Sequence, residues 1–69
     1  MNDMEKLSLL LSHWVEHNAE HASEFRAWAD QARAAGKEHV AARIESAAGK
    51  MIAANADLAE AIDGLQKGG

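Results

Sequence analysis

Three histidines recur at steps of four residues in the first half of the chain, and each is followed three residues later by a glutamate. The stretch reads HWVEHNAEHASE, so the histidines are His13, His17 and His21 and the glutamates are Glu16, Glu20 and Glu24. On an α-helix, a step of four residues advances the side chain by only about 40° beyond a full turn. His13, His17 and His21 therefore form one imidazole and carboxylate ridge with Glu20 and Glu24 if this segment is helical.

Such a ridge could bind a divalent metal ion. Histidines at i and i+4 can direct two ring nitrogens at one ion, and intervening carboxylates can complete the coordination or orient the rings. Imidazole with carboxylate suits Ni, Co, Zn or Cu(II), and the pattern does not choose among them. His13 and His17 are the pair most expected to share an ion, and Glu16 points furthest from the ridge. The predicted ligands are His13, His17, His21, Glu20 and Glu24.

His21 also has a purely structural interpretation. It falls on an apolar stripe between Trp14 and Phe25, where a neutral histidine bonded to Asn18 or Asn55 could fix the register of two packed helices. The other histidines and glutamates could equally form a solvated, weakly paired helix surface. The sequence leaves the metal-ligand role and these structural roles open.

Two long helices must position these residues. The chain has no proline, and its apolar positions recur at steps of three and four. The first stripe is Leu7, Leu11, Trp14, Asn18, His21, Phe25, Trp28 and Ala32, and the second is Val40, Ile44, Ala47, Met51, Ala54, Leu58, Ala61 and Leu65. The spacing of the apolar residues shifts by one residue around Gly36. A glycine there can adopt the left-handed conformation that ends a helix. Asn2 and Glu5 are spaced as a capping pair at the start.

The sequence therefore predicts an all-α fold in a single domain over residues 1–69, with helices at 3–34 and 38–65 packed as an antiparallel hairpin. Folding about Gly36 brings Asn18 close to Asn55. Each helix covers only one side of the other, so we expect two hairpins to pack into a homodimeric four-helix bundle. Trp14 and Trp28 are expected to anchor the hairpin or its partner.

Size and composition restrict the other possibilities. A chain of 69 residues has a thin core, and the absence of cysteine excludes disulfides and thiolate metal sites. A net charge of −4 without a basic stripe argues against nucleic acid. No apolar run approaches the roughly 20 residues that span a bilayer, so no membrane insertion is expected. The opening MNDMEKLSLLLSHW lacks the features of a signal peptide, so a cytoplasmic location is expected.

The sequence favours binding over catalysis. It has no cysteine nucleophile, no glycine-rich phosphate loop and no serine elbow, and ferritin-type sites need Glu-x-x-His rather than the His-x-x-Glu found here. We expect a non-enzymatic metal carrier, store or sensor. The alternative is a structural or adaptor hairpin, without metal, that mediates association with a second copy or a larger protein.

At HWVEHNAEH the sequence resembles short uncharacterised prokaryotic hairpin domains that share a His-Trp-x-Glu-His-Asn opening. The likeness covers about the first 30 residues. It implies a helical hairpin and no particular activity.

Overall fold

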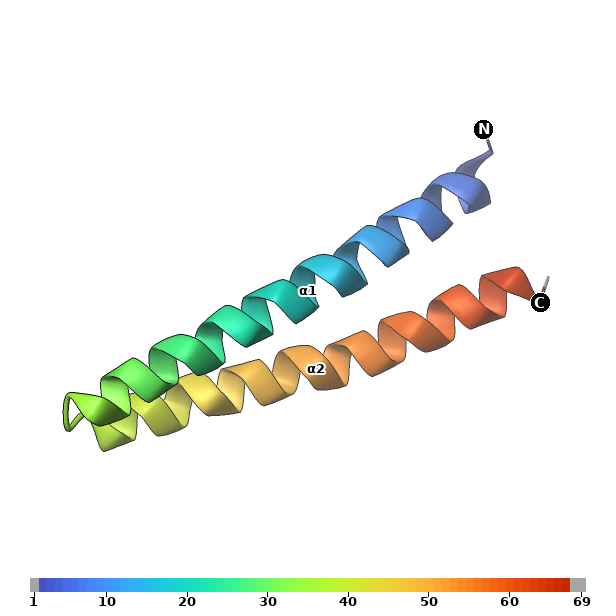
Figure 1. Cartoon of the computed structure of the whole chain (residues 1–69). Helices are drawn as coiled ribbons and strands as arrows, with labels where there is room; N and C mark the ends of the chain where they lie inside the picture. Colours follow the sequence, from blue (N-terminus) through green and yellow to red (C-terminus); the bar gives the residue numbers. More distant parts are fainter. Residues whose placement is uncertain (1, 68–69) are drawn as a thin grey trace.

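The computed structural model describes residues 2–67 and consists of two helices joined by a tight turn. Helix α1 spans Asp3–Ala34 and helix α2 spans Glu38–Gln66, and the two run antiparallel side by side (Figure 1). The predicted all-α hairpin is confirmed, with α2 one residue longer than expected. Met1, Gly68 and Gly69, which complete the predicted 1–69 domain, lie outside the described residues.

The start of α1 is capped by Asn2. Its side-chain oxygen accepts a hydrogen bond of 2.8 Å from the backbone N–H of Glu5, and its Nδ2 donates one of 3.2 Å to Glu5 Oε1. The first four N–H groups of a helix have no partner within the helix, so this bond satisfies one of them. The carboxylates of Asp3 and Glu5 also lie at the positive end of the helix. The predicted capping pair is confirmed.

Gly36 ends α1 in a left-handed conformation, with φ of 82°. The Lys37 N–H donates to the Ala32 carbonyl at 2.9 Å, and the Gly36 N–H donates to the Arg33 carbonyl at 2.9 Å. These two bonds form a Schellman motif, which satisfies free carbonyls of the last turn and reverses the chain direction. The break predicted from the slipped apolar stripe therefore lies at Gly36.

Alanine substitutions at Gly36 and Gly49 are expected to have opposite effects. A Cβ at either position would meet nothing within 4 Å, so crowding contributes to neither effect. Gly36→Ala should lower the free energy of unfolding by about 1–2 kcal/mol, because its φ is positive. Gly49 lies exposed within α2, so Gly49→Ala should raise that free energy by about 0.8–1 kcal/mol. Urea unfolding followed by circular dichroism, at one protein concentration, measures both, and the same sign for the two would contradict the left-handed cap.

Arg33 of α1 forms hydrogen bonds with α2 beside the turn. Its guanidinium donates two hydrogen bonds to Glu45, of 2.7 and 2.9 Å, and its Nε donates one of 2.8 Å to Glu38. The hydrogen bonds to Glu45 and then Glu38 raise the pKa of Arg33 above its ordinary value. The hydrogen bond from Arg33 lowers the pKa of Glu45. Since these side chains are partly exposed, the cluster orients the turn more than it stabilises the fold.

Small side chains make the contact between α1 and α2. Ala22, Ala29, Ala41 and Ala48 are between 0% and 1% exposed, and Leu11 is the one large side chain that is buried among the described residues. Helix separation depends on the side chains at the contact, and alanine permits a close approach. The two ribbons separate toward the chain ends in Figure 1.

A pair of asparagines crosses the middle of this interface. Asn18 Nδ2 donates to Asn55 Oδ1 at 3.0 Å, and Asn55 Nδ2 donates to the Val15 carbonyl at 2.9 Å. Any shift of one helix along the other would break both bonds and leave part-buried amide groups unpaired, so the pair fixes the register. The predicted proximity of Asn18 and Asn55 is confirmed.

Part of the predicted stripe was wrong by one residue. Trp14 and Trp28 are 41% and 68% exposed, and Val40 is 48% exposed. Their immediate neighbours Val15, Ala29 and Ala41 lie in the interface instead, half-buried or buried. An indole ring is too bulky for the closest approach of two helices, so the smaller adjacent residues occupy it.

Candidate functional site

The rings of the three histidines follow one another along one side of α1. His13 and His17 are stacked, with ring centroids 5.8 Å apart and an interplanar angle of 15°. His17 and His21 meet edge to face, with centroids 4.3 Å apart, and their Nε2 atoms are 2.9 Å apart. The ring of His21 also lies 6.3 Å, centroid to centroid, from that of Phe25. His17 and His21 therefore form the pair whose nitrogens converge.

The structure brings together two of the five predicted metal ligands. His13 stacks beside the converging pair, and Glu20 and Glu24 are exposed. Within residues 2–67, no three side chains of histidine, cysteine, aspartate or glutamate are grouped so that they could hold one ion. Residue spacing could not single out His17 and His21, because His13 and His17 have the same separation along the helix.

One side of the hairpin carries a second apolar surface. On α1, Trp14, His21 and Trp28 are seven residues apart, and on α2, Val40, Ala47 and Ala54 have the same spacing. A spacing of seven keeps residues on one side of a helix. We call this surface the tryptophan face and define it as Trp14, His21, Phe25 and Trp28 of α1 with Val40, Ile44, Ala47 and Ala54 of α2.

The α1 and α2 parts of the tryptophan face adjoin. Phe25 and Trp28 line one hollow together with Ile44 and Ala47, and no polar surface contributes to it. The side chains of Trp28 and Ala47 therefore lie on the same side of the hairpin. The sequence placed Trp14 and Trp28 on the apolar stripe, as anchors of the hairpin or of its partner, and did not distinguish these two positions. Their larger size relative to Val15 and Ala29, which lie in the α1–α2 contact, was the available signal.

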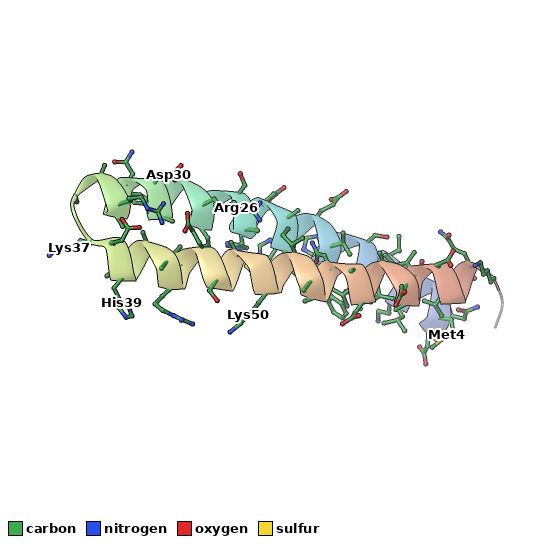
Figure 2. All side chains as sticks on the ribbon, turned by 90° about the horizontal axis from the view of Figure 1, so that it is seen from below. Met4, Arg26, Asp30, Lys37, His39 and Lys50 are labelled. Atoms are coloured by element: carbon green, nitrogen blue, oxygen red, sulfur yellow. The ribbon has the colours of Figure 1, made fainter. Side chains whose placement is uncertain are left out.

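Figure 2 shows His39 and Lys50 projecting from α2 on the side away from α1. His39 is exposed. None of the eight residues that define the tryptophan face is Lys, Arg, Asp or Glu.

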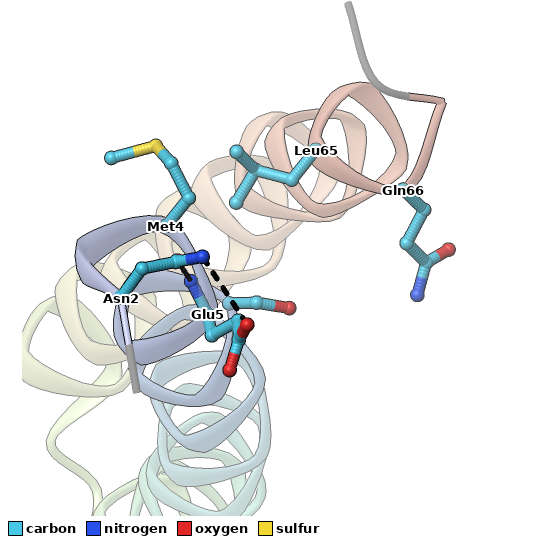
Figure 3. A pocket seen from close by; sticks show the side chains of 6 residues that line it. Asn2, Met4, Glu5, Leu65 and Gln66 are labelled. Carbon is cyan, nitrogen blue, oxygen red and sulfur yellow. Dashed lines mark hydrogen bonds between the residues drawn. The ribbon is translucent and has the colours of Figure 1, made fainter.

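A second hollow lies where the two helices diverge, at the end opposite the turn (Figure 3). Met4 and Leu65 contribute apolar surface, and Asn2 and Glu5 are joined by the hydrogen bonds of the α1 cap. Ser8 and Gln66 also line this hollow, and Glu5 is the one ionisable residue among its lining residues. Neither helix in the described part of the chain is both long and apolar enough to cross a bilayer.

Comparison with known proteins gives one match. A family model described as "Domain of unknown function (DUF8180)" matches residues 7–65. The match agrees with the expected likeness to a short uncharacterised domain, and it extends over both helices rather than about the first 30 residues. No curated protein and no solved structure matched the chain.

Proposed function

This chain belongs to the family described as "Domain of unknown function (DUF8180)", and we propose that its hairpin is a self-association module. In this proposal, two copies pack through their tryptophan faces to form a homodimeric four-helix bundle. The observation that carries the proposal is Trp28, which is 68% exposed beside the apolar hollow formed with Phe25, Ile44 and Ala47.

The surface area of the chain supports a partner of its own size. Its accessible surface is 5008 Å². A compact monomer of 7.4 kDa would expose about 4,200 Å². The excess of roughly 800 Å² is about the area that one partner buries in a standard protein interface. The radius of gyration of 15.7 Å also exceeds the value of about 11 Å for a compact chain of this length.

The shape of the tryptophan face favours a second copy of this chain as the occupant. The α1 part presents the large rings of Trp14 and Trp28, whereas the α2 part presents the small side chains of Ala47 and Ala54. In a two-fold interface each copy offers the same surface, so large groups must meet small ones. Rings of one copy packed on alanines of the other satisfy this requirement.

The absence of Lys, Arg, Asp and Glu from the tryptophan face favours this face over the rest of the surface as the contact between copies. Two copies each carry a formal charge of −4 and repel each other at long range. The eight residues of the tryptophan face include no Lys, Arg, Asp or Glu, so contact among these side chains brings no such charges together. Burial of an unpaired charge would cost several kcal/mol, and this face avoids that cost.

Sedimentation equilibrium of the tag-free, metal-free protein tests the proposal. We expect a mass of twice 7.4 kDa at micromolar concentration. The same samples should be helical by circular dichroism. A helical species with the mass of one chain under these conditions would overturn self-association and leave the tryptophan face to a different protein.

A further inference from the structure

We infer that His17 and His21 bind one divalent transition-metal ion through their Nε2 atoms. The two atoms are 2.9 Å apart and belong to residues one turn apart on α1, far from either helix end. A regular helix holds both Cα atoms in place, so binding requires only adjustments of the two rings. The inference uses side chains of a single chain, but His21 also belongs to the tryptophan face, so Ni(II) binding and self-association are measured on the same samples.

The separation of the two nitrogens is compatible with binding to one ion. Two nitrogens at about 2.0–2.1 Å from one ion are about 2.9 Å apart when they subtend a right angle, and about 3.3 Å apart in a tetrahedral site. The 2.9 Å between the hydrogen-bonded Nε2 atoms is close to both values, and a right angle needs the smaller movement of the rings. Cu(II) and Ni(II) favour this geometry with nitrogen and oxygen ligands. The remaining coordination positions are open to water.

A metal ion can replace the hydrogen bond between His17 and His21. At 2.9 Å, one Nε2 carries a hydrogen that it donates to the lone pair of the other. A metal ion needs both lone pairs, so the donating ring must move its proton from Nε2 to Nδ1. This change of tautomer leaves the ring neutral and releases no net proton. His17 is exposed, so solvent can carry the proton and deliver the ion.

The neighbouring histidine is excluded from the pair by its orientation. The ring of His13 is nearly parallel to that of His17, at 15°, and their centroids are 5.8 Å apart. Stacked rings direct their in-plane lone pairs alongside each other rather than toward a common point. His13 therefore serves as a matched control, since it has the same residue type and the same spacing from His17 as His21 has.

Calorimetric titration with Ni(II) of tag-free protein, stripped with a chelator, tests the inference. We expect His17→Ala and His21→Ala each to weaken Ni(II) binding by about a hundredfold, because each removes one of two linked ligands. His13→Ala and His39→Ala should leave the affinity within about twofold of the unmodified protein. Absence of Ni(II) binding by the unmodified protein, or equal losses in His13→Ala and His21→Ala, would overturn the assignment.

Two controls keep this result interpretable. Alanine is the best helix former, so circular dichroism should show the helical content of all four variants preserved. Sedimentation of the same samples reports self-association separately, so a change of mass and a loss of Ni(II) binding can be told apart.

Ni(II) affinity of the unmodified protein should also fall on acidification, because imidazole must be unprotonated to bind. A pH-independent affinity would count against histidine ligands.

Discussion

Replacement of Ala29 by leucine is expected to lower the free energy of unfolding by about 3 kcal/mol. Ala29 is 0% exposed, so a larger side chain must push the two helices apart or adopt a strained rotamer. Separation would also loosen the neighbouring contacts of Ala41. Urea unfolding followed by circular dichroism, at one protein concentration, measures the loss.

Ala27→Leu is the matched control for this prediction. Ala27 lies two residues away on α1 and is exposed, so leucine there meets solvent. Alanine and leucine have similar helix propensities, so the change should alter stability by less than about 0.5 kcal/mol. If both variants lose the same free energy, close packing of alanines does not hold the hairpin together.

Combined replacement of Trp14 and Trp28 by alanine is expected to abolish self-association. Each ring that becomes fully buried on assembly should contribute about 3–5 kcal/mol to it. The rings are 41% and 68% exposed in the single hairpin, so their loss should leave most of the α1–α2 contact intact. Sedimentation equilibrium over a range of concentrations should show a helical species with the mass of one chain.

Leu9→Ala controls for the general loss of apolar surface. Leu9 is 60% exposed and lies outside the tryptophan face. Its replacement should leave the dissociation constant of the dimer unchanged within about threefold, because an interface depends on a few central side chains. A dimer that survives the double tryptophan replacement would move the interface to another surface.

Much of the fold could be predicted because its signals are local. Gly36 lies where the apolar stripe slips by one residue and suits a left-handed cap, and Asn2 with Glu5 has the spacing of a capping pair. The contact between Asn18 and Asn55 could also be predicted, because the position of the turn determines which residues of the two helices lie opposite each other. The hydrophobic stripe was less informative, because α1 carries two adjacent stripes and hydrophobicity does not distinguish them. Packing the helices closely selects the stripe with smaller side chains.

The histidine ridge could be predicted as a ridge, but its internal geometry could not. Spacing places His13, His17 and His21 on one side of α1 in equivalent relation to one another. The stacked contact and the converging contact differ by side-chain rotation, which depends on neighbours such as Phe25. Residue types alone therefore indicated five candidate ligands where the structure brings two together.

The position of the alanine contact also determines how the chain can reach its fold. The four buried alanines lie in the half of the hairpin nearer the Gly36 turn, so shorter stretches of chain join them than join the residues nearer the chain ends. Loop closure costs less entropy for short loops, and local contacts make folding fast. Folding can therefore begin at the turn and extend toward the chain ends, with the Asn18–Asn55 pair forming after the alanines. Opening follows the reverse order, starting where the helices already diverge.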